Sequence, residues 1–353
     1  MRLKVFDVIN DPRRISSIDV FRCIAIIAVV AYHFNAFLPY GYIGVDLFFV
    51  ISGLLVGGIL TREFVKGTKT NPVKFIFQRG LKIWPSYYAF LIFGNMASAI
   101  IYQNSGGHTI PLNDMWRYLF FYQNYTGAPY HWSFDHVWSL CVEEHFYILL
   151  PVLFVIVQAF NKDRNNLRLL FICVILTIAA GIAFKFLSYN MGKDTFSATH
   201  NRLDALAWGV LLNLLITKYG HRLKNAKIVL SSLTAGSALF LAALLAHIYS
   251  DSEAFEKAGF HSLLPLSFFL VLLGVYYFDL SRLKILRFIA YYSYNWYLWH
   301  TIFVCLVTDK FGRTIPGFLV YLVTTFTAAM LSTIIIEETF LAKRDRLLKK
   351  LFT

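Results

Sequence analysis

The chain has 353 residues, of which 58% are hydrophobic and only 15% charged, and its mean hydropathy is +0.57. Soluble domains carry about a quarter of charged residues, so the composition excludes an ordinary soluble protein and indicates an integral membrane protein. The formal net charge of +13 would suggest a nucleic-acid partner in a soluble chain. In a membrane protein basic cytoplasmic loops explain it, so we expect no nucleic-acid partner.

Ten apolar runs are candidates for transmembrane helices, because a spanning helix needs about 17 to 25 predominantly apolar residues. The runs lie at 17–38, 42–61, 83–102, 138–160, 167–187, 203–217, 228–249, 261–278, 287–307 and 315–337, and the sixth is the shortest. We predict an all-α membrane protein, a polytopic bundle of about ten transmembrane helices. No small-residue cleavage site follows the first run, so we expect a retained helix rather than a signal peptide. Residues 1–353 are expected to form a single integral-membrane domain with no appended soluble domain.

The distribution of basic residues predicts the orientation of these helices. With a cytoplasmic N-terminus, the inner segments hold 25 of the 33 Lys and Arg residues and the outer segments hold six. This asymmetry follows the positive-inside rule, so both termini are predicted to be cytoplasmic. The four cysteines show no paired spacing, so we expect neither a disulfide nor a metal site.

Ionisable residues stand in the first two runs. Arg22 and His33 are eleven residues apart, about three helical turns, so they share a face about 16 Å apart along the axis. Asp46 heads the second run. Ionisable groups inside a spanning helix mark functional sites, and we expect Arg22 and His33 to line one common cavity. The structural alternatives are a packing role for His33 and snorkelling of Arg22 to the inner interface.

A carboxylate paired with a histidine is the usual general-base unit, and the fourth run offers Glu143 and Glu144 at a depth comparable to His33. Adjacent residues on a helix point about 100° apart, so the two glutamates are not expected to face one site. We therefore predict that His33 is oriented by Glu144, Glu143 or Asp46.

Three further sets of residues are candidates for binding. Arg79 and Lys82, predicted at the start of the third run, are either positive-inside anchors or a phosphate site near a helix N-terminus. His300 lies near the middle of the ninth run. Arg202 and Asp204, at the outer end of the sixth, either pair with each other, which we favour, or contact a substrate.

Several segments, in this order, resemble the acyltransferase-3 family of integral-membrane O-acyltransferases. After Arg22 and His33 they are GYIGVDLFFVISGLL (41–55), RGLKIWPSYY (79–88), WSLCVEEHFY (138–147), HNRLDALAWGVLL (200–212), YSYNWYLWH (292–300) and IIEETFLAKRDRL (335–347). The resemblance implies about ten transmembrane helices and transfer of acyl groups, commonly acetyl from acetyl-CoA, onto sugars of lipopolysaccharide, exopolysaccharide or peptidoglycan. It also implies a bacterial inner (cytoplasmic) membrane location.

The resemblance carries over to particular residues. It makes Arg22 and His33 the family's essential pair and places Arg79 in its basic donor-side motif. The second arginine of that motif is Lys82 here, which keeps the charge but loses the bidentate fork. The glutamine that usually follows the two glutamates is His145 here.

Together these observations predict an O-acyltransferase that moves an acyl group, expected to be acetyl, from cytoplasmic acyl-CoA to a hydroxyl of a glycan or glycolipid on the outer side, without a metal. Membrane lipid is the other expected partner. The residues expected to act in catalysis are His33, Glu144, Glu143 and Arg22; those expected to bind the donor are Arg22, Arg79 and Lys82; those expected to bind substrate or support the site are Asp46, Arg202, Asp204 and His300. The alternative is a polysaccharide transporter or flippase whose pathway these buried groups line.

Overall fold

A computed structural model describes residues 4–11, 14–35, 38–103, 107–126, 131–160 and 166–352. These residues are largely helical and include no strand. Seven helical segments in them are long and apolar enough to cross a membrane: Ser16–Phe34, Gly41–Val65, Asp135–Phe160, Arg168–Asn190, Ala226–Tyr249, Phe255–Val275 and Ile315–Arg344. The predicted all-α membrane fold is therefore confirmed. The count of ten spans and the cytoplasmic termini stay predictions.

Each of the ten predicted runs holds a helix. In chain order the helices at these runs are α2 (Ser16–Asn35), α3 (Gly44–Val65), α4 (Pro72–Ala89) with α5 (Asn95–Ile101), α7 (Trp138–Phe160), α8 (Arg168–Asn190), α9 (Leu203–Leu223), α10 (Ala226–Tyr249), α11 (Phe260–Val275), α12 (Lys284–Trp299) with α13 (Val304–Phe311), and α14 (Ile315–Ser332). Three further helices, α1 (Lys4–Ile9), α6 (Leu112–Leu119) and α15 (Glu338–Phe352), lie outside the runs. The segment between the third and fourth runs and the one between the fourth and fifth runs lie partly outside the described residues.

The third predicted run begins eleven residues too late. Helix α4 starts at Pro72, where the Asn71 side chain accepts a hydrogen bond from the Lys74 backbone N–H at 3.0 Å. Asn is a favoured N-cap and proline fits the first helical turn. Arg79 and Lys82 therefore lie well inside α4, and the predicted anion site at a helix N-terminus is wrong.

Three of the ten helical segments are less apolar than the other seven, and each brings polar side chains into the bundle. They are α4 with α5, α9, and α12 with α13. Asp204 of α9 and His300, directly after α12, have no exposed surface. The low hydropathy of these three segments thus reflects polar side chains that are directed into the bundle.

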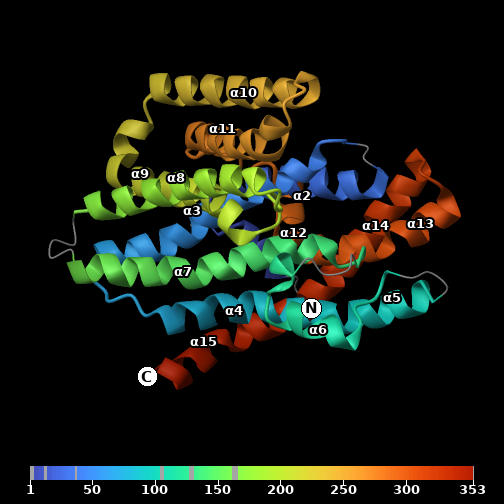
Figure 1. The fold of residues 1–353 in the computed structure, drawn as a ribbon. Helices are drawn as coiled ribbons and strands as arrows, with labels where there is room; N and C mark the ends of the chain where they lie inside the picture. Colours follow the sequence, from blue (N-terminus) through green and yellow to red (C-terminus); the bar gives the residue numbers. More distant parts are fainter. Residues whose placement is uncertain are drawn as a thin grey trace.

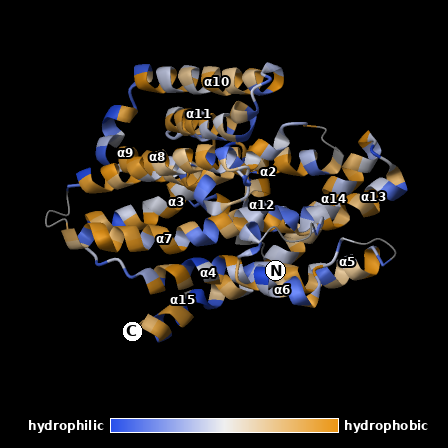
Figure 2. Cartoon of the chain, in the orientation of Figure 1, coloured by the Kyte–Doolittle hydropathy of each residue, from blue (hydrophilic) through white to orange (hydrophobic). Residues whose placement is uncertain are grey.

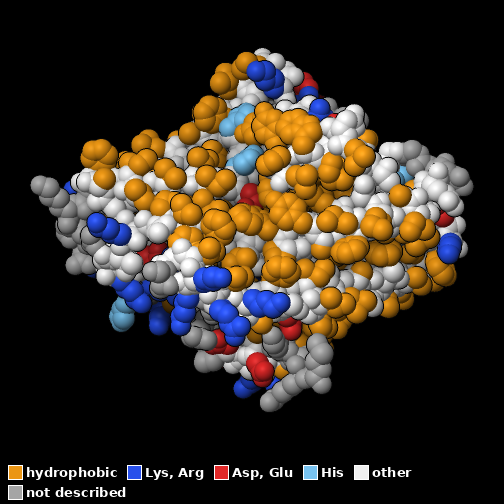
Figure 3. Space-filling view, turned by 90° about the horizontal axis from the view of Figure 1, so that it is seen from below, with side chains coloured by type: hydrophobic (Ala, Val, Ile, Leu, Met, Phe, Trp, Pro, Cys, Tyr) orange, Lys and Arg blue, Asp and Glu red, His pale blue; other side chains and the backbone are white. Residues whose placement is uncertain are grey.

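The bundle has a buried centre and an apolar exterior. Helix α3 lies near the middle and contacts α2, α7, α9 and α11, whereas α10 lies at the edge against α11 (Figure 1). Helix α10 is coloured orange to pale along most of the side seen in Figure 2, and its Leu230 and Leu241 side chains are 64% and 55% exposed. A helix that is hydrophobic all round is typical of a lipid-facing span. Figure 3 shows apolar side chains across the middle of one face, with most visible Lys and Arg side chains on its left half.

Helices α3 and α9 pack closely because each presents a glycine to the other. A Cβ added at Gly53 would stand 1.9 Å from the Leu206 carbonyl oxygen, and one at Gly209 would stand 2.0 Å from the Val50 carbonyl oxygen. Small residues allow this backbone approach between helices in a membrane. The contact fixes the height of α9 against α3.

We expect Gly53→Ala to lower the free energy of unfolding by about 1–3 kcal/mol, because the added methyl group meets backbone that cannot move aside. Thermal unfolding of the detergent-solubilised protein measures the loss. Gly58→Ala on the same helix is the matched control, since its new Cβ meets only the Asn213 side-chain nitrogen at 2.8 Å. Equal stability of the two variants would contradict this account of the packing.

Candidate active site

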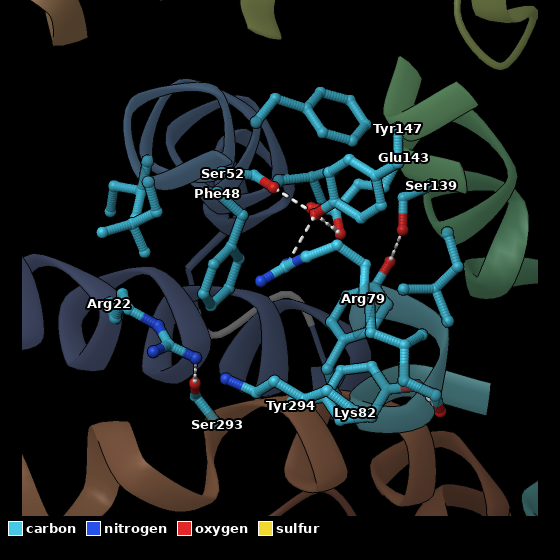
Figure 4. Close-up of a pocket in the computed structure, with 17 residues that line it drawn as sticks. Arg22, Phe48, Ser52, Arg79, Lys82, Ser139, Glu143, Tyr147, Ser293 and Tyr294 are labelled. Carbon is cyan, nitrogen blue, oxygen red and sulfur yellow. Dashed lines mark hydrogen bonds between the residues drawn. The ribbon is translucent and has the colours of Figure 1, made fainter. Parts of the chain in front are cut away.

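A small cavity, the cationic cavity, lies between α2, α3, α4, α7 and α12 and has a volume of about 120 Å³. Three basic side chains line it: Arg22 from α2, and Arg79 and Lys82 from α4. Figure 4 shows the nitrogen ends of these side chains converging on the same space. The structure thus brings together all three residues that were predicted to bind the donor.

Hydrogen bonds hold two of these cations in place. The Arg22 Nη2 donates to the Ser293 Oγ at 3.0 Å, and the Arg79 Nη2 donates to the Tyr147 hydroxyl at 3.3 Å. That hydroxyl donates to Glu143 at 3.0 Å. Among the described residues Glu143 is the one carboxylate that lines the cavity. Three cations against one carboxylate leave an excess of positive charge that favours an anionic ligand.

A second, larger cavity, the histidine cavity, has a volume of about 670 Å³. His33 of α2 lines it together with three other histidines and an aromatic wall. These other lining residues are His136, His247 and His261 with Tyr32, Phe34, Tyr42, Trp132, Trp138, Phe196 and Tyr297. A cavity of this size, largely aromatic with a few polar groups, has the character of a small-molecule site.

Arg22 and His33 do not share one cavity, contrary to the sequence-based expectation. Arg22 lines the cationic cavity and His33 the histidine cavity, and the two cavities have only Val45 and Tyr297 in common. The Tyr297 hydroxyl lies 2.7 Å from the Ser139 Oγ and donates to the His136 carbonyl oxygen at 2.7 Å. Val45 and Tyr297 therefore border both cavities, and we call these two side chains the partition.

The partners of His33 also differ from those predicted. Its Nδ1 lies 2.9 Å from the Val29 carbonyl oxygen and 3.2 Å from the His300 Nε2. The His136 ring stands close to both, with ring centroids 6.5 Å from His33 and 5.0 Å from His300. Among the described residues no group of His, Cys, Asp and Glu side chains is arranged to hold a metal ion, and this includes the group of His33, His136 and His300.

None of the three carboxylates proposed to orient His33 bonds to it. Glu143 belongs to the cationic cavity, and Glu144 accepts a hydrogen bond from the Trp84 indole nitrogen at 3.0 Å. Asp46 pairs with Arg202 at 2.6 Å and stands 3.3 Å from the His261 Nδ1. The predicted histidine–carboxylate unit is therefore absent from the described residues, because each acid is engaged elsewhere.

The predicted Arg202–Asp204 pair is also wrong. Arg202 pairs with Asp46, and Asp204 accepts a hydrogen bond from the Lys185 Nζ at 2.7 Å. Three rings enclose the Arg202 guanidinium at 5.3 to 5.7 Å, those of Phe49, Trp138 and Phe196. All four members of the two ion pairs are buried. We infer a structural role for this ionic cluster, which ties α3, α8 and α9 together.

Four residues of these sites were not predicted from the sequence, although a signal was present for three of them. Lys185 is an ionisable residue within an apolar run, and His261 stands at the head of another. His136 lies two residues before the fourth predicted run, in the short 3₁₀ turn that precedes α7. Tyr297 lies within an aromatic segment, where nothing distinguished it from packing residues.

The comparisons with known proteins bear on this arrangement. The sequence profile described as "Acyltransferase domain", that of the acyltransferase-3 family, matches residues 15–336. The chain belongs to the acyltransferase-3 family. The match covers both cavities and the ionic cluster. No solved structure matches the chain significantly.

Named relatives carry O-acetyltransferase in their descriptions. The O-acetyltransferase OatA of Staphylococcus aureus (strain NCTC 8325 / PS 47) is 26% identical over 341 residues, which cover 92% of this chain and 56% of that protein. A putative O-acetyltransferase of S. aureus strain COL is 28% identical over 319 residues, covering 85% of this chain and 52% of that protein. The chain thus spans about half the length of the curated relatives it matches, and its organisation as a single domain stays a prediction.

If the ionic cluster is structural, Arg202→Met will lower the free energy of unfolding by about 3–5 kcal/mol, because the buried Asp46 carboxylate loses its guanidinium partner. Thermal unfolding in detergent measures this effect. The double variant with Asp46→Leu removes both charges and should recover much of the loss. A single Arg202→Met variant with unchanged stability but weakened acceptor binding would instead support contact with a substrate.

Proposed function

We propose that this chain is a membrane O-acyltransferase that moves an acyl group, by preference acetyl, from acyl-CoA to a hydroxyl of a glycan or glycolipid across a bacterial cytoplasmic membrane. The observation that carries the proposal is the meeting of two chemically distinct cavities at Tyr297. One has the charge to hold an anionic donor and the other has the imidazoles and aromatic surface to hold and activate an acceptor. Membership of the family supports the reaction class.

The cationic cavity suits one part of acyl-CoA. Its volume of about 120 Å³ is well below the roughly 300–1,000 Å³ of cavities that enclose a drug-sized ligand. We therefore assign this cavity to the narrow pantetheine arm and not to the whole nucleotide. In this proposal Arg79 and Lys82 hold phosphate oxygens at the entrance and Arg22 lies further along the path of the thioester. The nucleotide remains at the basic cytoplasmic surface.

The histidine cavity suits the acceptor. At about 670 Å³ it lies within the range for small-ligand sites, and its wall is rich in aromatic rings. Aromatic side chains offer large rigid faces against which a sugar ring packs, and their polar tips offer hydrogen bonds. A single sugar unit carrying the reactive hydroxyl fits this volume, with the remainder of the glycan or its lipid outside.

His33 is the proposed general base. Its Nε2 accepts the proton of the acceptor hydroxyl as the hydroxyl oxygen bonds to the thioester carbonyl carbon. The carbon–sulfur bond then breaks, CoA leaves as the thiolate, and the proton passes from His33 to that sulfur. His136 is less suited to this role, because its Nε2 is buried without a hydrogen-bond partner or exposed surface. Direct transfer needs no acyl-enzyme intermediate.

The partition requires one movement in this cycle. A thioester in the cationic cavity reaches His33 only if Val45 and Tyr297 separate, which breaks the contact between the Tyr297 and Ser139 hydroxyl groups. Until then the partition keeps the activated acyl group away from water in the larger cavity. Separation of donor and acceptor until both are bound limits wasteful hydrolysis.

We expect His33→Ala to lower acyl transfer by about a hundredfold or more, because the step loses its base. Membrane vesicles supplied with labelled acetyl-CoA measure covalent label on added or endogenous glycan. The variant must first be shown to insert at normal levels. Normal acetylation by inserted His33→Ala would overturn the mechanism. Movement of unmodified glycan with no covalent label would favour the transporter alternative.

Val45→Phe tests the route between the cavities. The larger side chain obstructs the shared wall, so transfer should fall by about tenfold or more while acyl-CoA still protects the protein from thermal unfolding. Val45→Ala is the matched control, because it opens the same wall and should retain transfer. Full activity of Val45→Phe would show that the acyl group takes another path.

A further inference from the structure

We propose that His300 is the positioning residue for His33 and occupies the place that a carboxylate holds in a catalytic triad. The inference rests on the proposed function and deepens it, since it concerns the same base. The hydrogen bonds around the His33 and His300 imidazoles allow one placement of the ring protons, and the inference follows from that placement.

The tautomer of His300 follows from its own backbone contact. Its Nδ1 lies 2.7 Å from the Tyr297 carbonyl oxygen. A carbonyl oxygen only accepts hydrogen bonds, so the Nδ1 carries the proton. The neutral imidazole then has an unprotonated Nε2, which is an acceptor. That acceptor is the atom that faces His33.

The tautomer of His33 follows in turn. Its Nδ1 stands between two acceptors, the Val29 carbonyl oxygen at 2.9 Å and the His300 Nε2 at 3.2 Å. The proton of His33 is therefore on the Nδ1 and is shared between them. The Nε2 of His33 is left with its lone pair free, and His33 lines the histidine cavity. This is the state that a general base needs.

The same contacts support His33 after it has taken a proton. An imidazolium donates more strongly than a neutral imidazole, so its Nδ1–H bonds more strongly to the two acceptors. In a catalytic triad an aspartate both fixes the tautomer and stabilises the imidazolium. Here no described carboxylate contacts His33, and the neutral His300 provides the side-chain contact. A buried carboxylate at this depth would itself need compensation.

Local structure explains how His300 is held. Helix α12 ends at Trp299, and residues His300–Phe303 continue as a 3₁₀ turn. At such an end the last carbonyl groups of the α-helix lack their regular N–H donors. The His300 side chain donates a hydrogen bond to the carbonyl oxygen of Tyr297 instead. His300 has no exposed surface, and its ring packs against His33 with a centroid distance of 4.8 Å. The fixed ring gives the acceptor a defined position.

The test compares His300→Gln with His300→Leu in the full membrane protein. A glutamine oxygen can accept a hydrogen bond from the His33 Nδ1–H, whereas leucine cannot. We expect His300→Leu to lower kcat by about tenfold or more, with the KM for acetyl-CoA within about twofold of wild type. His300→Gln should recover most of that loss. His221→Gln, at an exposed position on α9, is the control that should leave transfer unchanged.

A spectroscopic measurement separates positioning from packing. In ¹⁵N-histidine-labelled wild-type protein, the His33 signal, assigned by its loss in His33→Ala, should show a protonated Nδ1 and an unprotonated Nε2. In His300→Leu its Nδ1–H signal should shift as one of its two acceptors is lost. The opposite tautomer in wild type would overturn the proposal, as would equal kcat loss in the Gln and Leu variants. If His300→Leu keeps the wild-type kcat while His33→Ala is inactive, the role of His300 is overturned and the proposed function stands. If His33→Ala is active, the proposed function itself is overturned.

Discussion

The cost of an uncompensated charge in a low-dielectric bundle governs how this protein is arranged. Charged groups there must pair with an opposite charge or face a polar cavity. The structure shows both solutions in separate places. Arg202 with Asp46 and Lys185 with Asp204 pair at 2.6 and 2.7 Å in buried surroundings. Arg22, Arg79 and Lys82 instead converge on a cavity where cations outnumber carboxylates. This difference in compensation distinguishes the groups that hold helices together from those available to a ligand.

Much of the fold could be predicted from the sequence, because an apolar run of spanning length has few alternatives in a membrane. The start of α4 was missed although Asn71 and Pro72 carry a helix-start signal, because the first eleven residues of the helix are too polar to extend the apolar run that begins at residue 83. Hydropathy records where a helix is apolar and not where it begins. The three less apolar segments show the same limit, because their hydropathy is lowered by inward-facing residues such as Lys82, Asp204 and His300.

The sequence does not predict in the same way which side chains pair between helices. Arg202 and Asp204 are close in sequence, but α9 turns them toward different neighbours, Asp46 of α3 and Lys185 of α8. The same holds for His33, whose side-chain partner His300 lies 267 residues away. Sequence patterns identified which residues are unusual for a membrane. The packing of helices distant in sequence decides which of them meet.

A histidine pair in place of a histidine and a carboxylate has a consequence for charge. A carboxylate beside His33 would make the resting site anionic, whereas two neutral imidazoles and two backbone carbonyl groups fix the same tautomer without a net charge. Charged side chains of both signs line the rest of the histidine cavity, Asp135 and Glu256 with Lys257 and Arg313. A donor thioester that reaches His33 therefore meets an uncharged base. In the proposed reaction the imidazolium forms as the thioester carbonyl oxygen becomes negative, so the two new charges appear together and each stabilises the other.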